Sequence, residues 1–430
     1  MPAAVAPALG QVTVAANQSP EFNALFQRTL RNPADVPLAL QFAALATRLG
    51  DYEAAIGTLE RVLFYAPDQS ALQLELAGLY YRLGSYASAR TYAEAAAGSR
   101  SLDEPSRSRA LDLLADIDRR LSSHQWNVYA QAGLRYQSNA NAAPTSLFVR
   151  AAGEPGRLDP RFRRQSDVSA FARAVVQHVY DFENQRGDVW ETSLSGYASR
   201  GFEVTRSDLG FLEIQTGPRL ALAPDSLPGL SLRPYLIAGG LALGSDPYLG
   251  SIGAGVGLSV PLGGRAVLEP FVEVRERRFG STDDYPNARE QTGRLAVFGL
   301  HASGSFSPAA GWFTRLAYRR AEARNDAYAF DSVGVDIGLP VTFDGPFGDR
   351  RWTVTPTFGL THYTYEAPNP LVDPTRRRRE TEWRVGALLD IPVHPLFGLS
   401  LHVQYSATQS NLPNYDTDNL SVTLGPTIRF

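Results

Sequence analysis

The hydrophobic residues of this chain follow two different spacings, and the change comes near Gln125. Residues 20–122 are rich in Ala, Leu, Arg and Glu, and their apolar positions recur at the spacing of α-helices. From Trp126 onward apolar and polar residues alternate, in about 14 segments that meet the criteria for strands. The pattern predicts an α-helical domain followed by a β-domain.

Two segments of the helical part share a motif at an offset of 34 residues. They read RLGDYEAA from Arg48 and RLGSYASA from Arg82, and they agree at Gly50 and Gly84, Tyr52 and Tyr86, and Ala55 and Ala89. This is the tetratricopeptide period, in which the glycine ends a first helix, the tyrosine packs between helices and the alanine admits a second helix closely. Pro33 and Pro67 have the same separation, and Pro67 is expected to close that second helix.

A half-repeat before Pro33 and a capping helix at residues 105–121 would complete a short solenoid, because such units cannot bury their faces alone. In the usual register the first helices of the repeats line the concave side. We expect client-binding contacts there from Arg48, Leu74, Tyr81 and Arg82. For the two arginines, a solvated charge at a helix end is an equally good interpretation.

The connections in the β-domain fall into two alternating classes. Compact Gly/Pro turns such as PLGG and SPAAG alternate with connections that include long polar loops, among them residues 139–165. An even number of antiparallel strands with short turns at one end and longer loops at the other is typical of an outer-membrane β-barrel. A two-layer sandwich with a solvated surface remains an alternative at this point.

The two faces of the strands differ in charge as well as polarity. Residues 266–277 place Leu268, Val272 and Val274 on one face, with Glu273 and Arg275 on the other. In a wide barrel the charged face lines the lumen. The predicted lumen-lining residues are Arg135, Glu273, Arg275, Arg315, Arg319, Glu382 and Arg384.

Two features favour the barrel over the sandwich. Aromatic residues lie near strand ends, where interfacial girdles would form: Trp126, Tyr136, Trp190, Trp312, Trp352, Tyr363 and Trp383. A meander of this many strands would also leave exposed edges, which closure removes. The sequence thus predicts a tetratricopeptide solenoid followed by an antiparallel transmembrane β-barrel of about 14 strands.

The last strand, residues 419–430, alternates up to the terminal Phe430. In a closed barrel it must pair with the first strand, so we expect the chain to end inside a ladder with Phe430 at the periplasmic rim as an assembly signal. An even strand count puts both barrel ends of the chain in one compartment. The predicted domains are an N-terminal extension at 1–19, a periplasmic repeat domain at 20–122 and an outer-membrane barrel at 123–430.

Composition and motifs give no indication of catalysis. The net charge of −3 provides no electrostatic case for nucleic-acid binding, and the absence of cysteine excludes thiolate chemistry. The histidines show no metal-binding spacing, and no Gly-x-Ser-x-Gly elbow occurs. The run Gly253–Gly257 lacks the helix that a nucleotide site needs, so its small residues are expected to ease barrel curvature or close packing. We predict no enzyme activity, cofactor or metal.

Two basic clusters lie in loops assigned to the outside of the cell. One is Arg376–Arg379, and the other consists of Arg157, Arg161, Arg163 and Arg164. Arginine suits phosphate geometry, so these clusters could bind lipopolysaccharide. Solvated loop charge explains them equally well.

The order of the domains and the stretch Tyr136–Pro144 (YQSNANAAP), which follows the first strand, resemble the surface lipoprotein assembly modifier (Slam) family of Gram-negative bacteria. The resemblance implies a translocon that delivers a lipoprotein or secreted client to the cell surface. The repeat domain would receive the client and the barrel would translocate it. Further partners would be the barrel assembly machinery and outer-membrane lipids.

Two other functions fit the same architecture. Exopolysaccharide export porins also join tetratricopeptide repeats to a barrel, although with many more repeats and with aromatic and acidic linings. A passive porin with a scaffold domain is the third possibility. Conductance in planar bilayers separates the porins from a plugged translocon.

Overall fold

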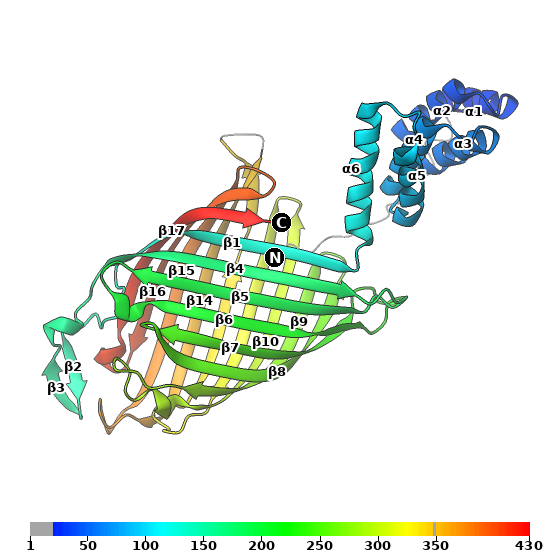
Figure 1. Cartoon of the computed structure of the whole chain (residues 1–430). Helices are drawn as coiled ribbons and strands as arrows, with labels where there is room; N and C mark the ends of the chain where they lie inside the picture. The colour runs from blue at the N-terminus through cyan, green and yellow to red at the C-terminus, as the bar shows by residue number, and fades with distance from the viewer. Residues whose placement is uncertain (1–19, 347–349) are drawn as a thin grey trace. The chain divides into compact units, whose positions relative to one another are not determined.

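The computed structural model describes residues 20–346 and 350–430, so the expected N-terminal extension at 1–19 lies outside the described residues. The chain divides into two compact units, a helical one that ends at Ser122 and a β unit that runs from Ser123 to Phe430 (Figure 1). Each unit has its own core and is described separately.

Six helices form the described part of the first unit: α1 (Pro20–Arg31), α2 (Val36–Arg48), α3 (Tyr52–Tyr65), α4 (Ser70–Arg82), α5 (Tyr86–Gly98) and α6 (Glu104–Leu121). Asp35 and Asp51 cap α2 and α3, since their carboxylates accept backbone N–H groups of the first turn at 3.0 Å. Gly50 and Gly84 follow α2 and α4 with φ of 82° and 76°, a left-handed conformation that suits glycine.

The repeat residues have the packing roles expected of them. Ala55 and Ala89 are fully buried, which lets neighbouring helices approach closely. Tyr52 and Tyr86 pack, partly buried, against the two largest apolar clusters of the unit. The tetratricopeptide prediction for this part of the chain is therefore confirmed. None of the described helices is both long and apolar enough to cross a membrane.

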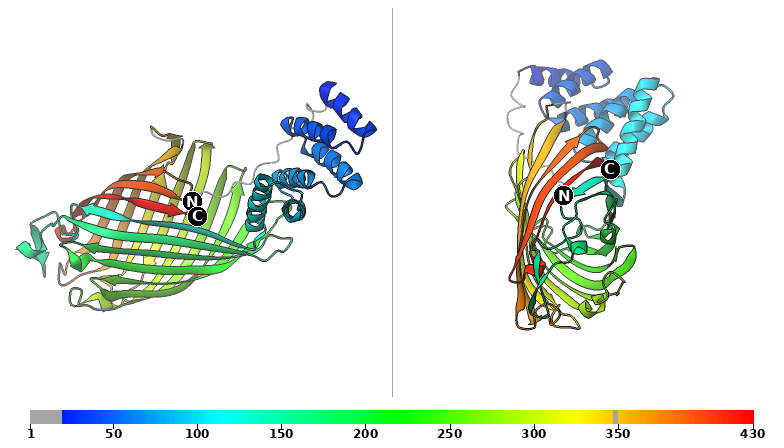
Figure 2. Two further views of the ribbon diagram at one scale, coloured as in Figure 1. Left: turned by 45° about the horizontal axis from the view of Figure 1, so that its top comes forward. Right: turned by 90° about the vertical axis from the view of Figure 1, so that its left-hand side faces the viewer.

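The second unit is a closed antiparallel barrel of fourteen strands in the described residues, with β12 and β13 counted as one strand interrupted at Leu339 and Pro340. Figure 2 shows it from two further directions. The strands are β1 (His124–Gln137), β4 (Asp167–Asp181), β5 (Val189–Gly201), β6 (Leu209–Ala221), β7 (Ser231–Leu243), β8 (Asp246–Leu262), β9 (Ala266–Phe279), β10 (Gly293–Ser307), β11 (Ala310–Ala321), β12 (Phe330–Gly338), β13 (Val341–Asp344), β14 (Arg351–Pro368), β15 (Arg377–Pro392), β16 (Phe397–Ser410) and β17 (Thr417–Arg429).

Each strand pairs with its neighbour in sequence, and β17 pairs with β1 to close the barrel. One end of the barrel carries compact turns, such as Gly263-Gly264. The other end carries most of the long loops, and the first of these contains a separate hairpin of β2 (Phe148–Ala151) and β3 (Glu154–Arg157). The connection at residues 244–245 is an exception, because there β7 and β8 are joined by a two-residue turn.

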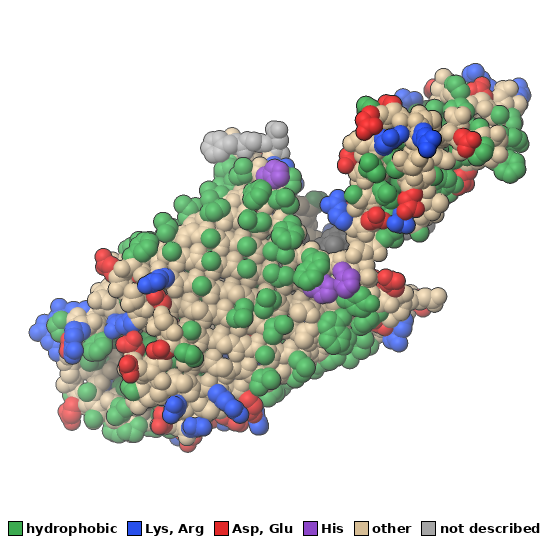
Figure 3. Space-filling view, viewed as in Figure 1, with side chains coloured by type: hydrophobic (Ala, Val, Ile, Leu, Met, Phe, Trp, Pro, Cys, Tyr) green, Lys and Arg blue, Asp and Glu red, His purple; other side chains and the backbone are tan. Residues whose placement is uncertain are grey.

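The barrel is apolar outside and polar inside. Large hydrophobic side chains such as Leu236, Ile252 and Val333 are exposed by more than 60%, while Glu273 and Thr427 on the opposite face are buried. Figure 3 shows hydrophobic side chains spread over the outer surface of the strands. This inversion of the usual burial pattern is the property of a barrel that faces lipid.

Charged pairs on the outer face mark where the apolar band ends toward the long loops. Glu276 bonds to Arg294 at 2.9 Å, and Arg320 bonds to Asp331 at 2.7 Å; three of these side chains are exposed, and Asp331 is partly exposed. Trp126, Tyr136 and Trp190 lie exposed on the same face, as the aromatic girdles require.

The girdle prediction was wrong for two of its seven residues. Tyr363 pairs with Ser332 and Glu380, which are both buried on the inner face, so its side chain points inward. Trp383 faces outward but lies well inside β15 rather than at its end.

Candidate functional site: the barrel interior and its seam

The structure places all seven predicted lumen residues on the inner face of the barrel. Strand pairing fixes this assignment, because every residue opposite an inward residue also points inward. They come from β1, β9, β11 and β15: Arg135, Glu273, Arg275, Arg315, Arg319, Glu382 and Arg384. Not all of them are equally available to a ligand, because several bond to each other.

An ion-pair network covers the inner wall from β5 to β9. Arg275 bonds to both Glu213 and Glu273, and the Tyr235 hydroxyl donates to Glu273 at 3.0 Å. A second group joins one carboxylate to two guanidiniums, with Glu191 bonded to Arg219 at 2.9 Å and to Arg233 at 3.4 Å. The prediction from sequence missed Glu191, Glu213, Arg219 and Arg233, although strand alternation marks each as facing the lumen.

Glycines let two aromatic rings lie flat on this wall. A Cβ on Gly255 would overlap the Tyr235 ring, and one on Gly299 would overlap the Phe271 ring. Gly253, Gly255 and Gly257 all face the interior, since they lie opposite inward residues of β9. Of the two roles expected for this run, the structure therefore supports close packing.

The opposite wall has its own neutralised pairs. Arg384 bonds to Asp336 at 2.8 Å and to Glu382 at 2.9 Å. Near the long loops, Arg378 bonds to Glu380 at 2.6 Å and lies 3.7 Å from the centre of the Tyr415 ring. The charges of these arginines and carboxylates therefore neutralise each other locally.

Five interior arginines form no ion pair with a carboxylate among the described residues. Arg135 and Arg173 donate to the neutral hydroxyls of Tyr197 and Tyr129, at 3.5 and 3.0 Å. The others are Arg277, which donates to the Glu322 carbonyl at 3.1 Å, Arg315 and Arg319. Their charge is left for other anions, which makes the interior electropositive at these points.

Arg315 and Arg319 also line a cavity of about 530 Å³ on the inner side of β6 to β11. The networked residues Glu213, Glu273 and Arg275 form another part of its lining. Neither this cavity nor any other part of residues 20–346 and 350–430 contains a group of three or more His, Asp or Glu side chains arranged to hold a metal ion.

The ladder at the seam between β1 and β17 is interrupted, as are the ladders of β6 with β7 and of β8 with β9. The pairing of β1 with β4 runs without a break, whereas that with β17 stops at Gln131↔Thr427 and resumes at Leu134↔Leu424. Gly425 lies in the gap beside Pro426, which has no N–H to donate to a ladder.

The backbones approach closely at this gap. A Cβ on Gly133 or on Gly425 would overlap the facing strand. At the compact-turn end the seam is closed by Phe430, whose N–H and carbonyl both bond to Val128, at 3.1 and 2.7 Å. The chain thus ends inside a ladder, as the alternation of its last strand predicts.

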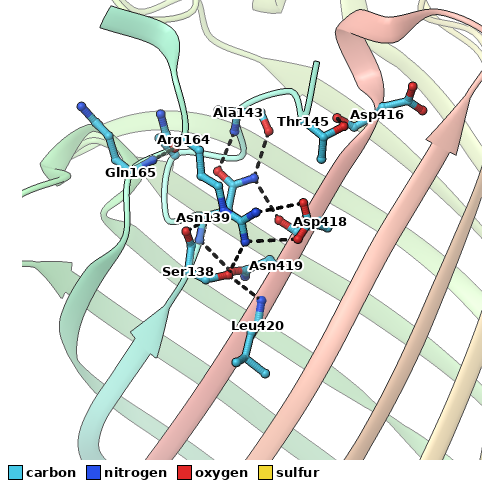
Figure 4. Close-up of polar contacts among 11 residues, drawn as sticks. Ser138, Asn139, Ala143, Thr145, Arg164, Gln165, Asp416, Asp418, Asn419 and Leu420 are labelled. Atoms are coloured by element: carbon cyan, nitrogen blue, oxygen red, sulfur yellow. Dashed lines mark hydrogen bonds and ion pairs between the residues drawn. The ribbon is translucent and has the colours of Figure 1, made fainter. Parts of the chain in front are cut away.

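The Asn-rich stretch after β1 closes the seam at its other end (Figure 4). Asn139 is 3% exposed; its amide donates to the carbonyls of Ala143 and Asp418 at 2.9 and 3.0 Å, and its backbone N–H donates to Asn419. The Ser138 hydroxyl accepts from the Leu420 N–H at 2.8 Å. We call Ser138, Asn139, Asp418 and Asn419 the clasp.

Arg164 adds an ion pair to the clasp. It bonds to Asp418 at 3.1 Å and donates to the Ser138 carbonyl at 2.9 Å. Arg164 belongs to one of the two basic loop clusters, in which Arg161 is also paired, with Asp159; in the other cluster Arg376 pairs with Asp373 and Arg378 with Glu380. Fewer arginines are therefore free to bind lipopolysaccharide phosphates than the sequence suggests.

The β2–β3 hairpin is fixed to other long loops. Arg150 bonds to the fully buried Asp373 at 2.6 Å, and its backbone exchanges two hydrogen bonds with the Asn414 side chain. Hydrogen bonds from the Thr375 hydroxyl and N–H, with the Arg150 charge nearby, hold the pKa of Asp373 below its usual value. The long-loop end is therefore an ordered structure on this side.

In the helical unit, the four predicted client-binding residues divide into two pairs. Arg48 and Arg82 are exposed. Leu74 packs instead against the cluster of Ala96, Leu102 and Ala110. Tyr81 donates its hydroxyl to Asp116 of α6, and its ring lies 4.9 Å from the Arg120 guanidinium. Leu74 and Tyr81 thus hold the second repeat against its neighbours.

Fold and site together define a class: tetratricopeptide-like helices joined to a closed antiparallel β-barrel with an apolar outer surface and a charged interior. The tetratricopeptide repeat family model matches residues 46–117. No curated protein matches the chain.

Solved structures resemble the two units only in outline. An anion-selective porin from Comamonas acidovorans is 8% identical with a TM-score of 0.36, covering 71% of this chain and 99% of that one. A bacterial polysaccharide outer membrane secretin is 8% identical with a TM-score of 0.34, over 71% and 98%. PcrH in complex with the chaperone binding region of PopD is 16% identical with a TM-score of 0.20, over 25% and 96%. Such scores support no argument about function.

Proposed function

We propose that this protein is an outer-membrane translocon, in which the repeat unit receives a lipoprotein or secreted protein client and the barrel carries it toward the cell surface. The observation that carries the proposal is the union, in one chain, of a peptide-binding repeat class with a barrel whose interior is charged. A passive scaffold would need no such repeat unit.

The topology supports a periplasmic position for the repeats. With fourteen strands, β1 begins and β17 ends at the compact-turn end of the barrel. Outer-membrane barrels carry their short turns in the periplasm and their long loops outside. The repeat unit would then meet its client before the client crosses the membrane.

A lipid-anchored client must also move its acyl chains into the membrane, and the seam is where we place its exit. The gap around Gly425 and Pro426 leaves the ladder interrupted in the apolar band. Ladder pairs join the strands on both sides of the gap, with the clasp at one end and the Val128–Phe430 pairing at the other, and at the gap itself the Gln131 amide donates to the Gly425 carbonyl at 3.3 Å. Every missing ladder bond lowers the cost of separating two strands.

A deletion of residues 1–122 tests the proposal. We expect the remaining barrel to insert, because its ladders close without the helices, and we expect surface display of the client to be lost. Display would be measured by protease accessibility on intact cells. Persistent display in the deletion would show that the repeats do not receive the client.

A finer version uses point substitutions on the repeat surface. R48E/R82E reverses two exposed charges on the predicted binding face and should weaken client capture by the full-length protein. R31E/R100E changes the same charge at exposed positions outside α2 and α4 and should leave capture unchanged. Equal behaviour of the two variants would contradict a binding role for this face.

A conduit for polysaccharide is the second candidate, and the interior aromatic rings favour it. Tyr129, Tyr197, Tyr235 and Phe271 all lie on the inner face. An open conductance in planar bilayers together with normal export of the protein client after deletion of residues 1–122 would favour this candidate over the translocon.

A further inference from the structure

One stretch of the barrel interior carries positive charge that no described carboxylate neutralises. On β9 and β11 the guanidiniums of Arg277, Arg315 and Arg319 point inward, and none of them forms an ion pair among the described residues. The buried Nε of Arg277 also has no hydrogen-bond partner among them. An unpaired charge in a protein interior is costly unless water or a mobile anion compensates it.

The carboxylates around these arginines are already engaged. Glu213 and Glu273 both bond to Arg275, and Glu191 bonds to two other arginines. Among the carboxylates that line the cavity, Glu269 alone has no ion pair in the described residues, and His301 lies between it and Arg315 in the sheet. The inner face of β9–β11 therefore keeps a net positive charge.

The spacing of the arginines matches an extended polypeptide. Arg315 and Arg319 lie on one face of one strand, four residues apart, which is ~13 Å at the rise of a β-strand. An extended peptide that runs along the wall repeats its same-side residues every ~6.8 Å. Its side chains at i and i+4 would therefore meet the two guanidiniums in register.

The space beside the arginines is open enough for such a segment. The cavity of about 530 Å³ lies against Arg315 and Arg319. Its floor is formed in part by Phe271, whose ring centre lies 4.8 Å from that of His301. The Phe271 ring gives a chain an apolar surface on which to lie along the wall, while its carboxylates bind Arg315 and Arg319 in the bidentate geometry that arginine favours.

We propose that the inner face of β9–β11 is an anion-binding track whose ligand is the carboxylates of an extended acidic polypeptide segment, held chiefly by Arg315 and Arg319. This inference rests on the proposed function, since it supplies the route for a protein client through the barrel. It assigns the ligand a chemistry that the translocon proposal leaves open.

The test is a binding measurement on the full-length protein in neutral maltoside micelles. Calorimetric titration with poly-L-glutamate should show binding that weakens as the ionic strength rises. R315Q/R319Q should bind at least about tenfold more weakly, because two charge-assisted contacts are lost. R200Q/R278Q removes the same charge from exposed positions on the outer face and should bind as the native protein does.

Four results would overturn the track, and the first three concern the polymers and the variants. They are no binding of poly-L-glutamate by the native protein, an equal loss in both double variants, and tighter binding of oligogalacturonate than of poly-L-glutamate, which would assign the site to an acidic saccharide. Equal affinity for free glutamate would show a site for small anions instead. Heat modifiability on gels confirms that each variant is folded.

Failure here is distinguishable from failure of the translocon. If R315Q/R319Q loses poly-L-glutamate binding but client display still requires residues 1–122, both proposals stand. If poly-L-glutamate does not bind while display still requires residues 1–122, the translocon stands and the track falls.

Discussion

At the scale of single residues, the direction of a side chain in this barrel follows from strand parity alone. Alternation places Arg275 and Arg315 inside. The same rule, applied along β14, places Tyr363 and Trp352 on opposite faces of the sheet. The error over Tyr363 was therefore avoidable, because one residue along a strand reverses the face. What parity cannot supply is the partner, so the pairing of Arg275 with Glu213 across 62 positions needed the structure.

Glycine at position 255 is predicted to be a packing requirement. In Gly255→Val the new side chain would displace the Tyr235 ring and break its hydrogen bond to Glu273, at a cost of about 1–3 kcal/mol of barrel stability. Gly250→Ala is the matched control, since a Cβ there meets nothing within 4 Å. The measurement is thermal unfolding in detergent. Equal midpoints for the two variants would contradict the packing role.

Asp116 is predicted to make the packing of α6 sensitive to acid. The Tyr81 hydroxyl, and then the Arg120 guanidinium, lower the pKa of Asp116. A lowered folded-state pKa stabilises the unit above the ordinary aspartate pKa of about 3.9, and this contribution is lost as pH falls through the folded value. Circular dichroism melts should show a smaller loss of helix stability below that pH in D116N than in the native protein. An unchanged pH profile in D116N would exclude the Asp116 contact as the cause.

At the scale of elements, the helices and the strands were largely predictable, and the seam was not. The repeat glycines and alanines mark α2 to α5 because their spacing is local. The clasp joins Asn139 to residues about 280 positions away, and no local pattern encodes such a contact. Similarly, the contacts of Leu74 and Tyr81 depend on where α6 packs, which the repeat pattern leaves undetermined.

The clasp is predicted to hold the long-loop end of the seam together. Asn139→Ala removes the side-chain hydrogen bond to the Asp418 carbonyl of β17 and the one to the Ala143 carbonyl within the loop, a loss of about 1–3 kcal/mol. Hydrogen exchange of residues 417–424 should become faster. Asn141→Ala removes contacts only to Arg163 and Gln165 within the same loop, so exchange in β17 should not change. Faster exchange in both variants would mean that the loop as a whole, and not the clasp, protects β17.

Locking the seam is predicted to block a lipid-anchored client. The chain has no cysteine, so L134C/L424C can form a disulfide between β1 and β17 with no competing thiol. L134C/A170C shares one substitution and links β1 to β4 instead. Under oxidation only the first pair should stop display, and a reductant should restore it. Display that continues through a locked seam would rule out lateral exit there.

At the scale of the whole molecule, the proposed function assigns client capture to the helical unit and client passage to the barrel. The helical unit presents exposed Arg48 and Arg82, and the barrel presents an interior with unpaired arginines. The sequence predicts this division because the hydrophobic period changes at one place, near the end of the helical unit at Ser122. Neither period encodes the client, which only binding chemistry and capture can identify.

The most direct test of transport through the barrel compares two adjacent residues of β16. Gln404 points inward and Val403 points outward, as their pairing with Gly386 and Ala387 requires. A photo-cross-linking residue at position 404 should capture the same protein that residues 1–122 retain in a pull-down, and one at position 403 should not. Capture of that protein equally from both positions, or from position 403 alone, would contradict passage of the client through the interior.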